Sequence, residues 1–522
     1  MDDQIGWESQ IPEFASFCEW LVANKQNGVE WPLLEGHTWM DWARSDVRIE
    51  RLKRMVEIGH SYGIMVGVDV PIAFAQQHSF RLLKNGNGKK DHLDEEVKEI
   101  QDSLDWVMKA GFDFLGTESG TSEFTHSSPE TMLNWMNAAA DYVSEKYDIT
   151  MFIKVHCSAG QIAKGYKDPR TNEDINFNML PHFASSSLGV LPHTVEPYAL
   201  DDPAPTYGNK DFGYIREYLN FELENGQRPV VFYPETAYWV SVDIDVPLFM
   251  PMYFERRFHD LRLLASDEDN STHKNRMDGQ LIFASGWEWG YWLNDAMAAR
   301  AAWNPLIEIA DEKEALRQLL RPLSIHMNTE EDKKEAEDLI IEWTVLEKEL
   351  LMVGKLEGKE KWEDIHRKNG HGYLEGWDTW DDVSKILGHL TQPDRLGLVE
   401  FKHGDGWFSH VKEHLWKHKK SDSVDAEYVT YVRPLLIEMD AKFTALSHKT
   451  VEIAARAPSY MHDLWDDIAD AGRMTALRAH QILCLYEYIH EMKNQGRNPA
   501  LAKEAMATLR TAQAIVNNRE HH

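Results

Sequence analysis

Residues 112–118 read FDFLGTE, a short apolar run that ends in a carboxylate, and similar runs recur along the first 300 residues. The others are VEWPLL (29–34), IMVGVD (64–69), TMFIKVH (150–156), the weaker GVLPHTVE (189–196), PVVFYPE (229–235) and QLIFASG (280–286). Continuously apolar runs of this length are typical of strands that are buried on both faces. The sequence therefore predicts seven strands in this part of the chain.

Segments with helical periodicity separate these runs. In Pro12–Asn27, for example, apolar residues recur three and four positions apart. Strands that alternate with helices form a parallel sheet, and we predict an α/β fold, a (β/α)8 TIM-like barrel. Such a barrel needs eight strands, so we expect the first strand to be missing upstream or to be irregular within residues 1–10. An open doubly wound sheet is the alternative, but the NGNG stretch at 85–88 lacks a dinucleotide-binding pattern and is expected to be a loop.

The pattern changes near Trp303, because strand candidates end there and long helical stretches follow. We predict helices at 312–320, 330–356, 377–387, 426–446, 450–457, 461–493 and 500–516. The chain is therefore expected to consist of a barrel domain of the catalytic type, residues 1–305, and a helical C-terminal domain, residues 306–522.

Composition excludes several classes of function. The chain has 522 residues, 43% of them hydrophobic, and its 86 acidic and 55 basic side chains give a net charge of −31. Such an acidic chain is a poor match for nucleic acid or an anionic membrane surface. No apolar run is long enough to span a bilayer. Residues 1–10 carry no signal-peptide pattern, so we expect a soluble protein, cytoplasmic, or periplasmic or secreted if a signal segment was removed.

Polar and aromatic side chains gather where the predicted strands end, the edge at which parallel α/β proteins bind ligands. The polar candidates are Asp69, Glu118, Lys154, His156, His193, Glu196, Glu235 and Glu288, and the aromatic ones are Phe124, Tyr198, Tyr233, Tyr238, Trp239, Trp287, Trp289, Tyr291 and Trp292. Carboxylates supply the acid, base or nucleophile of glycosidic cleavage, and flat rings match the apolar faces of sugars. The sequence therefore predicts a carbohydrate-binding site.

Two other functions use the same residues. A metal-dependent hydrolase or lyase would hold a divalent ion with His156, His193, Glu196 and Glu235. A non-catalytic glycan-binding barrel would use the aromatic side chains alone. We expect no cofactor and no tightly bound transition metal, because these donors lie on separate strands without a compact motif such as HExxH. The expected partner is a carbohydrate substrate.

With one strand placed before residue 1, Glu118 ends strand four, Glu235 ends strand seven and Trp287 follows strand eight. This arrangement resembles the clan of retaining β-glycosidases built on the (β/α)8 barrel. The resemblance implies that Glu118 is the acid/base, that Glu235 is the nucleophile and that Trp287 lines the sugar site. Thr117 stands where that clan has asparagine, and its hydroxyl would take over the contact with the sugar. The helical C-terminal region is similar to those that follow hexosaminidase-type barrels.

Whether the enzyme retains or inverts the anomeric configuration depends on the separation of the two carboxyl groups. A separation of about 5–5.5 Å favours retention, and about 6.5–9.5 Å favours inversion. We expect Glu118 and Glu235 to face each other, with Trp287 or Trp289 beneath the sugar. Pairs that include Glu196 or Glu288 are the alternatives.

Overall fold

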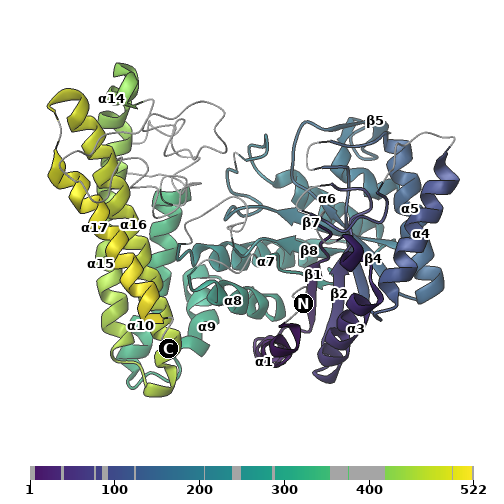
Figure 1. Cartoon of the computed structure of the whole chain (residues 1–522), viewed down its shortest axis with the longest axis horizontal. Coiled ribbons are helices and arrows are strands. Elements are labelled where there is room, and N and C mark those ends of the chain that lie inside the picture. The colour runs from purple at the N-terminus through teal and green to yellow at the C-terminus, as the bar shows by residue number, and fades with distance from the viewer. Residues whose placement is uncertain are drawn as a thin grey trace. The chain divides into compact units, whose positions relative to one another are not determined.

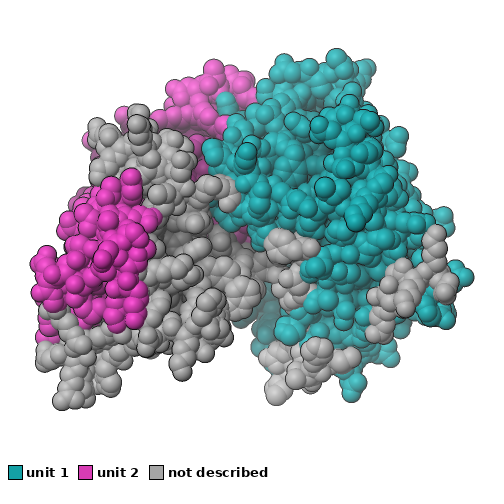
Figure 2. All heavy atoms as spheres, turned by 90° about the horizontal axis from the view of Figure 1, so that it is seen from above, with its two compact units in different colours: residues 1–234, 260–282, 299–305 teal, residues 235–259, 283–298, 306–522 magenta. Residues whose placement is uncertain are grey.

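The computed structural model describes most of the chain, namely residues 6–36, 40–75, 78–84, 92–122, 125–204, 206–237, 248–284, 289–352, 374, 418–496 and 498–519. Two compact units are distinguished within it (Figure 2). The first contains residues 1–234, 260–282 and 299–305, and the second contains residues 235–259, 283–298 and 306–522. The predicted domain boundary after residue 305 stays a prediction.

The first unit is built on a curled sheet of seven parallel strands, a half-barrel, in which each strand pairs with the next one along the chain (Figure 1). The strands are β1 (Gly28–Pro32), β2 (Met65–Asp69), β3 (Phe114–Glu118), β4 (Thr150–Val155), β7 (Leu188–Thr194), β8 (Val231–Pro234) and β9 (Gly279–Gln280). The predicted fold class and the seven strands are confirmed. The alternative of an irregular strand within residues 1–10 is wrong for residues 7–10, because a helix begins at Trp7. Residues 1–5 lie outside the described part.

Helices connect these strands, and several start at side chains that cap them. Ser45 and Ser128 each accept a hydrogen bond from a backbone N–H in the first turn that follows. The helices up to residue 303 are α1 (Trp7–Ala23), α2 (Met40–Ala43), α3 (Asp46–Ser61), α4 (Leu93–Met108), α5 (Pro129–Tyr147), α6 (Gly213–Asn225), α7 (Met252–Asn270) and α8 (Tyr291–Trp303).

One hairpin between β4 and β7 has no counterpart among the predicted elements. Its antiparallel strands are β5 (Ile162–Lys167) and β6 (Asp174–Asn176), followed by a 3-10 helix at Phe177–Phe183. Most side chains of β5 are exposed, so its sequence, IAKGYK, lacks the apolar run by which the other strands were predicted.

The register of the parallel strands assigns alternate residues to the two faces of the sheet. On the outer face Val66, Val68 and Ile153 are completely buried. Helices such as α3 and α5 pack against the strands and cover this face (Figure 1). The inner face takes the intervening residues, including Gly67 and Phe114, which are register partners.

Small and large side chains alternate across the inner face. A Cβ atom on Gly67 would lie 2.3 Å from the ring of Phe114, and one on Gly189 would lie 2.5 Å from the ring of Phe152. The two rings themselves pack edge to face, with centroids 6.3 Å apart. The glycines therefore make room for the phenylalanines that fill the half-barrel.

The second unit is mainly helical. Its long helices are α9 (Glu312–Ser324), α10 (Glu330–Glu347), α15 (Arg433–Ala454), α16 (His462–Asn494) and α17 (Pro499–Arg519), with a short α14 (Asp422–Glu427), a 3-10 turn at Ser459–Met461 and π-helical turns at Lys348–Met352 and Tyr428–Val432. The predicted helices 426–446 and 450–457 are continuous across residues 447–449, because α15 runs through them. The predicted helix 377–387 lies outside the described residues.

The core of this unit contains Trp343, which stacks on Phe443 with centroids 5.5 Å apart. No helix among the described residues has the length and apolar character needed to cross a bilayer.

We expect Gly67→Ala and Gly189→Ala each to lower the free energy of unfolding by about 1–3 kcal/mol, the usual cost of overpacking. Gly28→Ala is the matched control, because its Cβ would meet no atom closer than 3.7 Å. Urea unfolding of the three variants measures the difference. Equal midpoints for all three would show that the inner face tolerates a larger side chain.

Candidate functional site

Three carboxyl groups and one ammonium group lie on the inner face, toward the ends of four neighbouring strands. Glu30 is on β1, Asp69 ends β2, Glu118 ends β3 and Lys154 is on β4. The register pairs Asp69 with Gly116 and Glu118 with Lys154, so these side chains share one face. We call these four residues the carboxyl cluster.

The cation of the cluster is paired with one particular carboxylate. Lys154 Nζ donates a hydrogen bond to Glu118 Oε1 at 2.8 Å, and the two side chains are only 11% and 14% exposed. An ion pair held away from water is stronger than one on the surface, because solvent screens it less. Glu118 is therefore held in place by the neighbouring strand.

The other two carboxyl groups have raised pKa values. Burial, and then the negative charge of Glu118, raise the pKa of Asp69 to about 7. Burial, followed by the charges of Asp69 and Glu118, raises the pKa of Glu30 well above its usual range. Because one lysine faces three acids, the cluster keeps protons near neutral pH.

Glu30 packs directly against the backbone of β3. A Cβ atom on Gly116 would lie 2.6 Å from Glu30 Oε1, so the glycine leaves the space that this carboxyl group fills. The other oxygen, Glu30 Oε2, is buried and has no hydrogen-bond partner among the described residues. A buried carboxyl oxygen in this state is consistent with a group that is placed to meet a ligand or to hold a proton.

Two histidines and two tyrosines continue the polar inner face beyond β4. His156 follows β4 and His193 is on β7, with ring centroids 5.8 Å apart. Tyr207 packs edge-on against His156 with centroids 5.0 Å apart, and Tyr233 of β8 lies 5.0 Å from His193. The result is a group of aromatic rings with polar edges.

Hydrogen bonds fix the proton positions of both imidazoles. The backbone N–H of Ser158 donates to His156 Nδ1 at 3.1 Å, so the proton of the neutral ring is on Nε2. Burial, and then the charge of Lys154, lower the pKa of His156 to about 3, which keeps the ring neutral. His193 donates from Nδ1 to the backbone oxygen of Tyr233 at 2.7 Å. His156 therefore offers an N–H donor.

The remaining predicted residues have different surroundings. Glu196 has a φ of +58° and accepts a hydrogen bond from Thr206 Oγ1 at 2.6 Å. Glu235 belongs to the second unit, where its backbone oxygen accepts a hydrogen bond from Arg257. Its pairing with Glu118 stays a prediction.

The predicted aromatic residues are only partly described. In the second unit Trp289 packs beside Met474 and Ile515, and the guanidinium of Arg519 lies 4.7 Å from the centroid of its ring. Tyr291 is the first residue of α8, and Tyr198 is buried. The predicted sugar contacts of Trp289 and Tyr291 stay predictions. The others, Phe124, Tyr238, Trp239 and Trp287, lie outside the described residues, as does Glu288.

Glu30 and Tyr207 are not among the candidates that the sequence indicates, whereas Lys154 is. A signal for Glu30 was present, because it is the one charged residue in an otherwise apolar strand. The pairing of Lys154 with Glu118 is not apparent from the sequence, because the two residues are 36 positions apart. The structure places this lysine on the adjacent strand.

The histidines of this face do not form a metal site with Glu196. In the described part of the chain, His156, His193 and Glu196 do not form a group of three ligand atoms within 4.8 Å of one another. The two groups that meet this condition lie on helices of the second unit.

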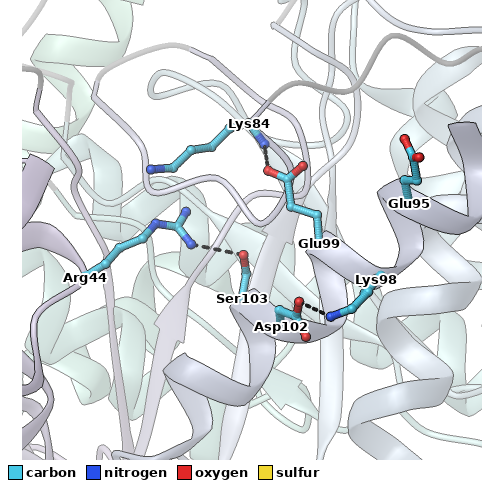
Figure 3. Close-up of a pocket in the computed structure, with 7 residues that line it drawn as sticks. All are labelled: Arg44, Lys84, Glu95, Lys98, Glu99, Asp102 and Ser103. Atoms are coloured by element: carbon cyan, nitrogen blue, oxygen red, sulfur yellow. Dashed lines mark hydrogen bonds and ion pairs between the residues drawn. The ribbon is translucent and has the colours of Figure 1, made fainter.

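A separate surface pocket lies beside α4, with a volume of about 450 Å³ (Figure 3). Its charges compensate one another, because Arg44 and Lys84 both contact Glu35, and Lys98 pairs with Asp102. The lining residues are Arg44, Lys84, Glu95, Lys98, Glu99, Asp102 and Ser103, none of which is a predicted site residue.

No model of a known protein family matches the chain, and no curated protein sequence matches it. Among solved structures, a GH138 enzyme targeting pectin rhamnogalacturonan II matches with a TM-score of 0.52 and 10% identity, over 97% of this chain and 58% of that enzyme. CpGH84B matches with a TM-score of 0.42 and 9% identity, over 98% of this chain and 71% of that protein. A mutant O-GlcNAc hydrolase from Thermobaculum terrenum matches with a TM-score of 0.39 and 10% identity, over 98% of this chain and 93% of that protein. The neighbours are glycoside hydrolases, and at such identities the GH138 likeness shows a shared fold.

The raised pKa of Asp69 predicts a pH-dependent stability. Between its ordinary pKa of 3.8 and the folded value of about 7, the folded chain keeps a proton that the unfolded chain has lost. Stability therefore falls as the pH rises through this window. Asp69→Asn removes this titrating group. At pH 8 we therefore expect the free energy of unfolding of the variant to be higher than that of the parent by at least about 1.4 kcal/mol, the equivalent of one pKa unit. At pH 3.5 the two should be similar.

Asp105→Asn is a control of opposite sign. Burial alone raises the pKa of Asp105, but hydrogen bonds from Lys146, Tyr147 and Tyr142 outweigh it and lower the pKa. We expect this variant to be less stable than the parent at pH 8. Urea unfolding of both variants at both pH values measures these differences. A loss of stability at pH 8 in Asp69→Asn would contradict a raised pKa of Asp69.

Proposed function

We propose that the protein is a glycoside hydrolase-like enzyme and that the carboxyl cluster is part of its active site. The observation that carries the proposal is the contrast between Asp69, which holds a proton near neutral pH, and Glu118, which is ion-paired with Lys154. Glycosidic cleavage needs one carboxylic acid and one carboxylate beside the same bond. The inner face provides both on neighbouring strands.

The electrostatics suggest a division of roles within the cluster. Asp69 carries the proton and is suited to protonate the leaving oxygen. Glu118 works as the carboxylate, which activates water or stabilises positive charge on the sugar ring. The resemblance assigns both proton steps to Glu118, and the revised division rests on the ion pair of Glu118 with Lys154.

Neutral histidines and aromatic rings suit a carbohydrate substrate. His156 offers its Nε2–H to a sugar hydroxyl, and the rings of Tyr207 and Tyr233 provide flat surfaces for the apolar face of a pyranose. The fold shared with an enzyme that targets a pectin supports the same class of substrate. We therefore propose a polysaccharide or oligosaccharide substrate.

Glu235 keeps its role as the proposed nucleophile. If it acts so, the enzyme retains the anomeric configuration, because two displacements restore it. If a water molecule attacks directly, the product is inverted. NMR of the first product anomer distinguishes these outcomes, and Glu235→Gln should abolish only the retaining reaction.

The test of the function is a screen of aryl glycosides and of plant polysaccharide fragments, including rhamnogalacturonan II, each with and without EDTA. We expect hydrolysis that EDTA leaves unchanged. Loss of activity on chelation would favour a metal-dependent hydrolase or lyase. Binding without turnover would favour a glycan-binding barrel.

Substitutions in the cluster test the assigned roles on the best substrate. We expect Asp69→Asn and Glu118→Gln each to lower kcat/KM by about 10²–10⁴-fold, the usual contribution of acid–base catalysis. Glu13→Gln, on the exposed side of α1, is the matched control and should act like the parent. Parent rates in both cluster variants would rule out this active site.

The pH profile gives an independent test of Asp69. The parent's kcat/KM should fall above pH 7, about tenfold per pH unit, because Asp69 loses its proton there. The residual activity of Asp69→Asn should lack this limb. A parent profile that is flat from pH 6 to 9 would contradict the role of Asp69 as the proton donor.

A further inference from the structure

Three helices of the second unit bring four metal-ligating side chains together, far along the sequence from the carboxyl cluster. His480 and Cys484 lie one turn apart on α16, so they share one face of that helix. Asp440 is on α15 and Glu504 is on α17, and both contact His480. Packing of α16 against α15 and α17 thus builds the group.

The spacing of three of these atoms fits a single ion. His480 Nε2 lies 3.6 Å from Cys484 Sγ and 3.0 Å from Glu504 Oε1, and all three atoms lie within 4.8 Å of one another. A tetrahedral zinc ion, with bonds of about 2.0 Å to nitrogen and 2.3 Å to sulfur, holds its nitrogen and sulfur ligands about 3.5 Å apart.

Asp440 orients the imidazole of His480 toward the other two possible ligands. Its two carboxylate oxygens lie 3.1 and 3.2 Å from His480 Nδ1, so Nδ1 donates to Asp440 and Nε2 points to Cys484 and Glu504. A carboxylate on the far nitrogen is the usual partner of a metal-bound histidine, because it fixes the ring and raises its basicity.

The ligand types also indicate the class of metal. Hard cations such as Ca²⁺ and Mg²⁺ prefer oxygen ligands, whereas a thiolate, an imidazole and a carboxylate together suit zinc and similar ions. Cys484 is 3% exposed, while the side chains of His480 and Glu504 are 32% and 54% exposed. The site is therefore open to solvent on the side of His480 and Glu504.

A second group of possible ligands serves as a comparison. His418 Nε2 and His490 Nδ1 both contact the same oxygen of Asp425, at 2.6 and 2.8 Å. These are hydrogen-bond lengths to one acceptor, and Asn494 donates to the other oxygen. This group is therefore explained as a hydrogen-bonded network.

We propose that His480, Cys484 and Glu504 bind a zinc-type transition metal ion that joins α16 to α17. The inference is independent of the proposed glycosidase activity. It revises the expectation of no tightly bound transition metal, which was based on donors at strand ends and did not consider the helices.

The test uses the untagged full chain, stripped of metal and kept reduced, and titrates it with Co²⁺ and then with Zn²⁺ in competition. We expect one equivalent of cobalt to produce a thiolate-to-cobalt charge-transfer band in the near ultraviolet, which zinc abolishes. Cys484→Ser should remove the band and weaken zinc binding at least tenfold. Asp440→Asn should keep the band but weaken binding by about 10–100-fold, the usual effect of losing such a partner.

Matched variants separate this site from other ligands. His490→Ala and the double variant His521→Ala/His522→Ala should bind cobalt like the parent, with the same band. We also expect Glu504→Gln to weaken metal binding. Because this side chain is exposed, that result does not require any change at the buried Cys484 thiol. The proposal is overturned if cobalt binds without the band, if Glu504→Gln and folded Cys484→Ser bind zinc as tightly as the parent, or if His490→Ala abolishes binding. In those cases His480 is a structural imidazolium between two carboxylates.

Discussion

The parallel register of the seven strands decides which side chains face one another on the inner face, and the proposed chemistry depends on it. Because side chains alternate along a strand, a shift of one residue would turn the carboxyl cluster toward the helices. The glycine–phenylalanine contacts oppose such a shift, since Phe114 fits over Gly67 and Phe152 over Gly189. The apolar part of the half-barrel therefore positions its polar edge.

The polar edge itself opposes folding. Three carboxyl groups lose water there and one lysine compensates them, so two of the acids respond with raised pKa values. A surface designed only for stability would place apolar or neutral groups at these positions. Groups with displaced pKa values concentrate at functional sites for this reason, and the cluster fits that pattern.

Much of the fold was predictable, because it follows from local pattern. Apolar runs predicted all seven parallel strands, and the switch to helical periodicity predicted the C-terminal helices. The β5–β6 hairpin was not predicted, because the side chains of β5 are mainly exposed and form no apolar run. Part of the candidate site was predictable, because Asp69, His156 and His193 follow from their place at strand ends. The ion pair of Glu118 with Lys154 was not, because it joins residues 36 positions apart, and only the register shows that they are neighbours.

The close approach of Glu30 to Gly116 makes the side chains that fit at the two positions depend on each other. Any side chain at position 116 must displace the Glu30 carboxyl group, so a methyl group there requires the Glu30 side chain to turn away or to be replaced by a shorter one. Homologous sequences should therefore show the two positions changing together. A glycine at position 116 would mark the relatives that keep a carboxyl group over the third strand, and its replacement would mark those that have changed this part of the inner face.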